Sequence, residues 1–373
     1  MKNALTLLFV LMIWLTACDA MPAASTTAPP PSPSEASMTE AAAAPLAEIQ
    51  LPAGYGMRGA WFELYFTNPN SPLAPQETGG IDGPLAKSID SARLSVDVAI
   101  YSLSLNSVRD ALLRAHDRGV HVRVVMESDN RERADPQRLI DAGIPVLGDR
   151  REGLMHNKFA VIDNSVVWTG SMNFTDSGTY QDNNDLIMIR SVKMAENFTR
   201  EFEEMFTDDK FGPDTVPETP NPRVTIDGTP IDVYFSPDDN VQANLLELVS
   251  NARESIYFMA FSFTADPLGD AVRARAQDGL VVSGVMDSEQ VNSNIGTEFD
   301  PFSQAGVDVL RDNNAGQMHH KVIIIDGNIV VFGSYNFTNN AETVNDENLI
   351  VIYNEDIAAQ FSGEFERIYS QAQ

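Results

Sequence analysis

Two short stretches of the sequence carry the same reactive side chains at the same spacing. HNKFAVID and HHKVIIID both fit the pattern H-x-K-x-x-x-x-D, and they lie 163 residues apart. The fixed positions are His156, Lys158 and Asp163 in the first copy, and His319, Lys321 and Asp326 in the second. A histidine can act as a nucleophile or proton donor near neutral pH without a metal. A lysine beside it supplies positive charge for phosphate oxygens, so the pattern points to chemistry on a phosphoryl group.

Each motif is followed by a matching polar tail at the same offset. GSMNFT supplies Ser171 and Asn173, and GSYNFT supplies Ser334 and Asn336. Residues two apart in a strand point to the same face, so each histidine should emerge beside its lysine. The serine and asparagine follow about fifteen residues later, past a strand turn. They would add neutral hydrogen-bonding groups to the same anion.

These residues resemble the two H-K-D motifs of the phospholipase D superfamily, and the resemblance extends through both halves of the chain. It implies a metal-independent, two-step cleavage of a phosphodiester, with no cofactor. One motif histidine forms a phosphohistidine, while the other protonates the leaving alcohol and then activates water. Carried over by position, His156 and His319 take these roles. The lysines and asparagines of the motifs would hold the phosphoryl oxygens, assisted by the serines. Family members more often use the N-terminal histidine as nucleophile, which favours His156, but nothing in the sequence decides this.

The motif aspartates, Asp163 and Asp326, belong to the catalytic set that the resemblance carries over, yet their spacing favours a structural role. Seven residues along an extended strand span over roughly 20 Å, so neither can touch its own histidine without a reversal of the chain.

The resemblance also implies that an acidic residue further downstream orients each histidine. Glu347 matches that position in the second half, whereas the first half has Asn184 with Asp185 beside it. This difference predicts that His319 has the stronger carboxylate support for a protonated imidazole ring.

Other candidate residues are assigned to packing. His320 should alternate away from His319, and no acidic or cysteine cluster accompanies it at metal-binding spacing, so we predict no metal site. Tyr101, Phe261 and Phe263 fall at or near predicted strand ends. They would either line the mouth of the substrate site or pack in the core, and core packing is favoured.

The elements around the motifs repeat as well. Apolar strands, amphipathic helices closed by glycine, and second strands recur in the same order; they are 94–104, 107–119 and 120–128 in the first half, and 255–264, 268–279 and 280–288 in the second. A further helix and strand end each series, at 142–147 and 305–310. We therefore predict an α/β fold of two similar lobes from an internal duplication, each a mostly parallel or mixed sheet flanked by helices.

Composition shifts divide the chain into five segments. We predict a signal peptide with a lipobox at 1–18, an Ala/Pro/Ser/Thr-rich disordered tether at 19–58, a first lobe at 59–211, a linker at 212–228 and a second lobe at 229–373. The segment Leu15-Thr16-Ala17-Cys18 resembles a bacterial lipobox, which would make Cys18, the only cysteine, the lipidated first residue of the mature protein. The expected location is extracytoplasmic, lipid-anchored to a bacterial membrane.

Charge bears on the substrate. The 25 Lys+Arg residues face 53 Asp+Glu residues, a formal net charge of −28, and such a surface repels polyanions. A phospholipid substrate is therefore favoured over nucleic acid. A nuclease stays open as the alternative, because five arginines of the first half could form a local positive groove: Arg114, Arg118, Arg123, Arg150 and Arg151. A third reading, an inactive binding or scaffold protein, is disfavoured because both motifs are intact.

Two further expectations concern assembly and subclass. Both half-sites lie in one chain, so we expect a monomer. Cardiolipin synthases of the superfamily usually carry membrane-spanning segments, and the sequence after the leader has no apolar run near eighteen residues, so a synthase is disfavoured.

Overall fold

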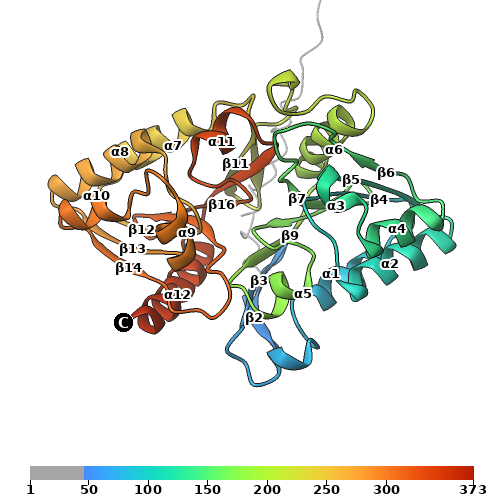
Figure 1. The fold of residues 1–373 in the computed structure, drawn as a ribbon, viewed down its shortest axis with the longest axis horizontal. Coiled ribbons are helices and arrows are strands. Elements are labelled where there is room, and N and C mark those ends of the chain that lie inside the picture. The colour runs from blue at the N-terminus through green and yellow to red at the C-terminus, as the bar shows by residue number, and fades with distance from the viewer. Residues whose placement is uncertain (1–45) are drawn as a thin grey trace, which may run out of the picture. The chain divides into compact units, whose positions relative to one another are not determined.

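The computed structural model describes residues 46–373 of the chain, so the predicted signal peptide, Cys18 and the first part of the tether lie outside the described residues. Within the described part, one sheet has nine strands in the order β1-β2-β3-β9-β8-β7-β4-β5-β6. Figure 1 shows these strands in blue to green. In chain order they are β1 (Ala47–Leu51), β2 (Gly54–Arg58), β3 (Phe62–Thr67), β4 (Ser95–Ile100), β5 (His121–Met126), β6 (Val146–Gly148), β7 (Lys158–Ile162), β8 (Val166–Gly170) and β9 (Asp185–Arg190).

The second sheet repeats this arrangement. Among the described residues it has eight strands, in the order β10-β11-β17-β16-β15-β12-β13-β14. They are β10 (Arg223–Ile226), β11 (Thr229–Ser236), β12 (Ser255–Ala260), β13 (Val281–Met286), β14 (Asp308–Arg311), β15 (Lys321–Ile325), β16 (Ile329–Gly333) and β17 (Glu347–Tyr353). The strands β7 and β15, which open with the motif lysines, occupy equivalent places in the two sheets.

Helices flank both sheets. They are α1 (Asp82–Ser91), α2 (Asn106–Asp117), α3 (Ser128–Arg131), α4 (Ala134–Asp141), α5 (Asp176–Tyr180) and α6 (Val192–Phe206) with the first sheet, and α7 (Val241–Ser250), α8 (Asp266–Gln277), α9 (Ser288–Ser293), α10 (Phe299–Gln304), α11 (Asn339–Thr343) and α12 (Glu355–Ala372) with the second. Two short 3₁₀ turns span Ala74–Gln76 and Gly212–Asp214. The repeated helices α2 and α8 each end before a glycine with positive φ, Gly119 at 85° and Gly279 at 94°, because this residue type adopts that backbone conformation without strain.

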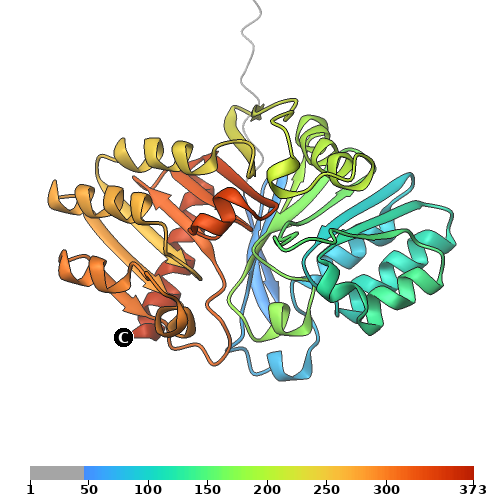
Figure 2. The ribbon, with the colours of Figure 1, turned by 45° about the horizontal axis from the view of Figure 1, so that its top comes forward.

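Three hydrophobic cores hold the elements together. One core lies between the first sheet and helices α1, α2 and α4, and its counterpart lies between the second sheet and helices α7, α8 and α10. A third core is shared, because it combines residues of both sheets with α6 and α12. Figure 2 shows the two sheets side by side, with α7, α8 and α10 along the side of the second sheet that faces away from the first. The shared core joins the two halves through buried apolar side chains.

The predicted α/β fold with two similar halves is confirmed, and of the two predicted sheet types, mostly parallel or mixed, the sheets are mixed. Parallel pairing is confined to β4-β5-β6 and β12-β13-β14. The remaining pairs are antiparallel, because β7, β8 and β9, like β15, β16 and β17, do not follow a helical crossover in the same direction.

Two predicted boundaries differ from the structure. The tether was predicted to run to residue 58, but Ala47–Leu51 and Gly54–Arg58 form β1 and β2 at the edge of the first sheet. The two strands, AEIQL and GYGMR, are short and lack a strong apolar pattern, and β1 at the edge pairs with β2 alone. The predicted linker likewise contains β10, which pairs with β11.

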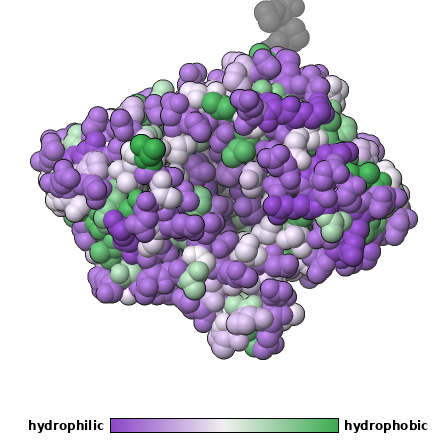
Figure 3. All heavy atoms as spheres, viewed as in Figure 1, coloured by the Kyte–Doolittle hydropathy of each residue, from purple (hydrophilic) through white to green (hydrophobic). Residues whose placement is uncertain are grey.

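Hydrophilic residues cover most of the face seen in Figure 3, and hydrophobic residues appear there in small separate groups. Within residues 46–373, none of the helices combines the length and the apolar character needed to span a bilayer.

Candidate active site

The two motif histidines stand just before β7 and β15, in segments that pair with the opposite half of the chain. The backbone N–H of His156 donates to the carbonyl of Asp346 at 2.9 Å, and the N–H of His319 donates to the carbonyl of Asn183 at 3.0 Å. Single parallel bridges join Met155 to Asp346 and Asn183 to Met318. Each histidine is therefore positioned by the half that does not contain it, and the two halves build one site.

The side chain of each histidine also bonds a residue of the opposite half of the chain. Nδ1 of His156 lies 2.7 Å from Oε2 of Glu347, and Nδ1 of His319 lies 2.9 Å from Oδ1 of Asn184. The prediction that His319 has the stronger carboxylate support is therefore wrong. The carboxylate belongs to His156, because the start of β17 crosses to the other half instead of facing the histidine of its own half.

Asn184 is fixed by three hydrogen bonds. Its Nδ2 donates to the carbonyl of Gly178 at 2.8 Å, and its Oδ1 also accepts from Ser171 Oγ at 2.9 Å. The amide oxygen is thus the atom that faces the imidazole ring, so Nδ1 of His319 carries the proton in the neutral ring. Nε2 of His319 is left with a lone pair, as a proton-transfer group requires.

Both motif lysines are buried beneath the histidines. Lys158 Nζ donates to the carbonyl of His156 at 2.7 Å, and Lys321 Nζ donates to the carbonyl of His319 at 2.6 Å. Burial lowers the pKa of Lys158 to about 7, partly offset by Glu347. Burial, followed by repulsion from Lys158, lowers the pKa of Lys321 well below its ordinary value. An anion bound here would restore both charges, so the site is suited to a phosphoryl group.

The histidines are poised as neutral rings. His156 is 7% exposed and His319 is 5% exposed. Burial lowers the pKa of His156 to about 4, against the opposing effect of Glu347. Burial and then the charges of Lys321 and Lys158 hold the pKa of His319 well below its ordinary value. A neutral imidazole is the form that attacks phosphorus or accepts a proton from water.

The polar tails of the motifs lie close by. Ser171 Oγ donates to Asn184, and Ser334 Oγ accepts from the backbone N–H of Asn348 at 3.0 Å. The side-chain oxygens of Asn173 and Asn336 are buried and have no hydrogen-bond partner within residues 46–373. An amide oxygen only accepts hydrogen bonds, so these atoms cannot bind a phosphate oxygen, and any contact of these side chains with a phosphoryl group would be made by Nδ2.

The glycine before each serine is required by close packing. A Cβ at Gly170 would lie 2.4 Å from the carbonyl oxygen of Asp185, and one at Gly333 would lie 2.4 Å from that of Asn348. Only a residue without a side chain lets each serine segment run this close to the next strand.

The motif aspartates lie at the far ends of β7 and β15. Asp163 accepts hydrogen bonds from the backbone N–H groups of residues 93–95 at 2.7–3.1 Å, and Asp326 accepts from those of residues 253–255 at 2.7–3.1 Å. Neither is among the side chains that contact the histidines. Their position is that of turn-stabilising residues at the start of β4 and β12.

Several residues at the site were not assigned to it from sequence. The ring of Tyr101 lies 5.2 Å from that of His156, and the ring of Phe261 lies 4.6 Å from that of His319. Phe263, by contrast, is buried in the core of the second half. Glu127 and Asp287 accept from the backbone N–H groups just before the histidines, at 3.1 and 3.0 Å. The sequence contains a signal for this acidic pair, because the equivalent strands β5 and β13 lead into the matching segments VMES and VMDS.

His320 belongs to a buried ionic network. Its Nδ1 lies 2.7 Å from Asp185 and its Nε2 lies 3.0 Å from Glu364, which in turn pairs with Arg367 at 2.7 Å. These hydrogen bonds raise the pKa of His320 although burial lowers it. Among residues 46–373, no group of three or more metal-ligating side chains is arranged to hold a metal ion.

The five arginines of the first half do not form an open positive groove. Each is paired with a carboxylate: Arg114 and Arg118 with Asp90, Arg123 with Asp97 and Glu203, Arg150 with Asp209, and Arg151 with Asp346. The positive charge of these arginines is therefore neutralised by ion pairs within the protein, so it contributes little to binding a polyanion.

Comparison with known proteins agrees with this geometry. A family model described as "Cardiolipin synthase, PLD-like domain" matches residues 85–206 and 245–369. The mitochondrial cardiolipin hydrolase of Chlamydomonas reinhardtii is 32% identical over 127 residues, which cover 34% of this chain and 56% of that protein. Cardiolipin synthase A of Proteus mirabilis is 25% identical over 315 residues, covering 74% of this chain and 65% of that protein.

The fold is shared with a solved structure as well. Phosphatidylserine synthase of Haemophilus influenzae superposes with a TM-score of 0.61 at 12% identity, over 78% of this chain and 84% of that chain. The chain spans about half to two thirds of the length of the curated relatives it matches. Both halves match the same family model, and together the matched segments make up more than half of the sequence. The chain therefore belongs to the PLD-like domain family of the phospholipase D superfamily.

Proposed function

We propose that the protein is a metal-independent phosphodiester hydrolase that cleaves the head-group phosphodiester of phospholipids through a phosphohistidine. The observation that carries this proposal is the exchange of histidine partners, Glu347 to His156 and Asn184 to His319. The exchange supports one site with two chemically different histidines. Two such histidines are what a two-step phosphoryl transfer needs.

His156 is the nucleophile in this proposal. Once Nε2 is bonded to phosphorus, a ring that keeps its Nδ1 proton stays positively charged for the lifetime of the intermediate. The carboxylate of Glu347 at 2.7 Å is a permanent counter-ion for that charge, whereas the amide of Asn184 is neutral. His319, with its low pKa, releases a proton readily and suits the acid–base role.

The steps balance as follows. The bound phosphodiester anion favours the charged form of His319, which takes up a proton from solvent at Nε2. The lone pair of His156 Nε2 then forms a bond to phosphorus while the bond from phosphorus to the head-group oxygen breaks, and protonated His319 gives its proton to that oxygen. Water then enters, His319 takes one of its protons, and the water oxygen bonds to phosphorus as the N–P bond breaks. The products are phosphatidate and the free head-group alcohol, and both histidines return to their starting states once His319 gives its proton back to solvent. Lys158 and Lys321 stabilise the charge on the phosphoryl oxygens throughout.

Three observations favour lipid over nucleic acid. The net charge is −28. The five arginines that could have formed a groove are neutralised by carboxylates. The name of the Chlamydomonas relative states an activity on cardiolipin. A lipid anchor at Cys18 would hold a monomeric enzyme at a bacterial membrane, outside the cytoplasm, where such a substrate lies.

The test uses the purified full chain in EDTA, with mixed phospholipid vesicles and plasmid DNA as parallel substrates. The His156→Ala chain is the background control. Head-group release with intact plasmid is the expected result. Nicked plasmid with untouched lipid would instead support the nuclease alternative. Loss of turnover in EDTA that a divalent ion restores would contradict the metal-independent mechanism.

A further inference from the structure

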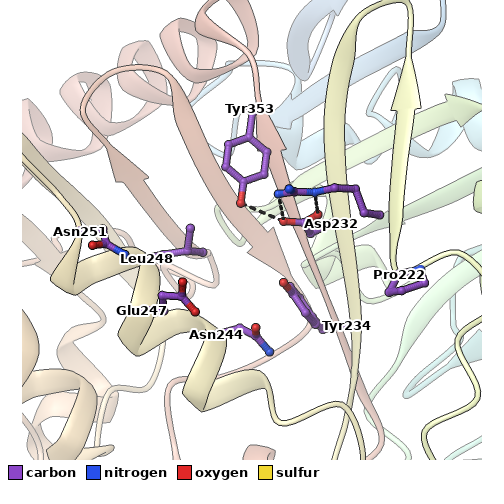
Figure 4. Close-up of a pocket in the computed structure, with 9 residues that line it drawn as sticks. Pro222, Asp232, Tyr234, Asn244, Glu247, Leu248, Asn251 and Tyr353 are labelled. Atoms are coloured by element: carbon purple, nitrogen blue, oxygen red, sulfur yellow. Dashed lines mark hydrogen bonds and ion pairs between the residues drawn. The ribbon is translucent and has the colours of Figure 1, made fainter.

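An equivalent groove lies on the helix-covered face of each sheet, away from the histidines. The first-lobe groove, of about 480 Å³, lies between α1 and strands β1, β3, β8 and β9. The second-lobe groove, of about 330 Å³, lies between α7 and strands β11 and β17. Figure 4 shows the second-lobe groove, with Glu247 and Leu248 on the helix facing Tyr234 and Tyr353 on the strands. Both volumes fall in the range of small-molecule sites.

The two grooves share a floor inherited from the duplication. A cross-strand arginine–carboxylate pair lies in each, Arg58 with Glu63 in the first and Arg223 with Asp232 in the second. Two residues after each carboxylate comes a tyrosine, Tyr65 or Tyr234, and these also line the grooves. The positions therefore correspond one to one, and differences between them are informative.

The groove walls differ in charge. Lys87 on α1 stands where Glu247 stands on α7, and Arg190 at the end of β9 stands where Tyr353 stands in β17, 163 residues later. Counting charged side chains, three cations and one carboxylate give the first-lobe groove a charge of +2. One cation and two carboxylates give the second-lobe groove −1. A positive groove is unusual in a chain whose net charge is −28.

The cations of the first-lobe groove keep hydrogen-bond donors available. Glu63 Oε1 accepts from Nε of Arg58 at 2.9 Å and from Nη2 of Arg190 at 3.1 Å, one donor from each guanidinium group. Lys87 is exposed and has no ion-pair partner within residues 46–373. In the second-lobe groove both oxygens of Asp232 are bound by Arg223, and Tyr353 adds a third bond at 2.8 Å. A guanidinium group has five donors, so the first-lobe groove can still bind an anion.

Glu63 cancels only one of the three positive charges of the first-lobe groove. Burial alone would raise the pKa of Glu63, but hydrogen bonds from Tyr65 and the two arginines hold it below its ordinary value, so it is ionised. With Glu63 ionised, three cations and one carboxylate leave the first-lobe groove with a net charge of +2.

Apart from Ser88 and Ser91 on α1, the uncharged part of the first-lobe groove is mainly apolar. Ile49 and Leu51 of β1 and Met188 of β9 line it, next to a stacked pair of rings, Tyr65 and Trp168, whose centroids are 5.9 Å apart. We propose that this groove binds one anionic phospholipid molecule, at a site separate from the active site. Its phosphate lies among the cations of Arg58, Lys87 and Arg190, and its apolar part lies against β1.

The geometry favours a lipid over a nucleic acid. Bases bind to proteins by stacking on exposed aromatic faces. Tyr65 and Trp168 are each 2% exposed and already stack on one another, so they offer no free face. The half-buried side chains of Ile49 and Leu51 instead offer aliphatic contact.

The test is a titration of the full chain carrying His156→Ala, which prevents turnover, with monomeric dihexanoyl-phosphatidylglycerol. Trp168 lies in the groove wall, so its fluorescence reports occupancy, and Trp168→Phe identifies that part of the signal. Parallel titrations use dihexanoyl-phosphatidylcholine, inorganic phosphate and a short single-stranded oligonucleotide. We expect phosphatidylglycerol to bind most tightly.

The matched variant transplants the second-lobe residues, Lys87→Glu with Arg190→Tyr. We expect binding at least tenfold weaker, while activity on a soluble phosphodiester, measured in chains that retain His156, is unchanged. Adding Glu247→Lys and Tyr353→Arg restores the net charge of the whole chain without restoring the groove, so the Trp168 response stays weak.

Several outcomes would overturn the proposal. These are unchanged binding in the swapped variant, recovery in the fourfold variant, equal binding of phosphate or phosphatidylcholine, and tighter binding of the oligonucleotide. If the double variant does not fold, Lys87→Glu alone serves, because that side chain is exposed. The active-site proposal is untouched by any of these results, because it is tested by turnover.

Discussion

Glu347, at the start of β17, holds His156 of the other half through a hydrogen bond of 2.7 Å between Oε2 and Nδ1. The equivalent bond in the opposite direction, from His319 to Asn184, ends on a neutral amide. The duplication has thus kept the geometry of two half-sites and changed the charge of one. Each half still has one carboxylate and one amide at these two positions. The first half has Asn184 followed by Asp185, and the second half has Glu347 followed by Asn348. In one half the charge faces the motif histidine, and in the other it faces His320.

Replacing Glu347 by Gln should lower kcat on the order of 100-fold with a smaller effect on KM, because the amide cannot neutralise a charged phosphohistidine. Stopped-flow release of the head-group alcohol would show whether the first step is the one slowed. Glu366→Gln, an exposed change on α12, is the matched control. A loss of less than threefold in Glu347→Gln would show that the carboxylate does not support the nucleophile.

Activity should depend on pH through the free enzyme. His156 must be neutral to attack, and its pKa is lowered to about 4, so kcat/KM should fall as pH drops through that value. His319 must take up a proton, and its pKa is held well below its ordinary value, so kcat/KM should also fall as pH rises. Lys158 must be charged, and its pKa is lowered to about 7, so the fall should steepen above pH 7. The profile of kcat/KM against pH is therefore a bell with its maximum between these values.

The variant Lys158→Arg identifies the alkaline limb, because an arginine stays charged. The absolute rate of this variant will be lower because the site is tightly packed, but the fall above pH 7 should become shallower, since only His319 then titrates on the alkaline side. Lys193→Arg, at an exposed lysine of α6, should leave the profile unchanged. An alkaline limb that stays equally steep in Lys158→Arg would assign the steeper fall to another group.

The sequence predicted the fold well because the signals were periodic and duplicated. Helices α2 and α8 and strands β4 and β12 lie within a few residues of their predicted ranges. The predicted tether missed β1 and β2, because these five-residue strands, AEIQL and GYGMR, leave little apolar pattern. The histidine partners were assigned to the wrong halves for a different reason. Sequence spacing measures distance within one half, and these contacts are made across the shared core.

Asp163 should matter for stability and not for turnover. It accepts hydrogen bonds from three consecutive backbone N–H groups, and its φ is +50°, a conformation that Ala adopts poorly. Asp163→Ala should lower the free energy of unfolding by about 1–3 kcal/mol, and Asp163→Asn should lower it less. Urea denaturation measures the loss, and kcat of the folded fraction should stay within about twofold of the parent.

The same comparison applies to Asp326, whose φ is +51°. If burial acted alone it would raise the pKa of Asp326, but the N–H donors hold it below its ordinary value. This contribution to stability is present above the ordinary carboxylate pKa and is lost as pH falls through the lowered value. A large fall in kcat for either alanine variant, with normal unfolding, would instead place the aspartates in catalysis.

His320 should stabilise the junction of the two halves in its protonated form. It joins Asp185 of the first half to Glu364 of α12, and all three side chains are buried. Its counterpart 163 residues earlier is Asn157, which bonds the neutral Asn348. His320→Asn should therefore lower the free energy of unfolding by about 3–5 kcal/mol, since it leaves the buried Asp185 without a cation and Glu364 with Arg367 alone. Adding Asp185→Asn should recover part of that loss, because it copies the neutral pair of the other half-site.

The pH dependence of this loss separates charge from packing. The pKa of His320 is raised by its two carboxylates, so its stabilising effect is complete below its ordinary value and disappears as pH rises through the raised one. The difference in unfolding free energy between the parent and His320→Asn, measured in urea at pH 6 and pH 9, should shrink at the higher pH. A difference that is equal at the two values would mean that His320 acts through its shape, and that the charge rearranged between the halves plays no part in holding them together.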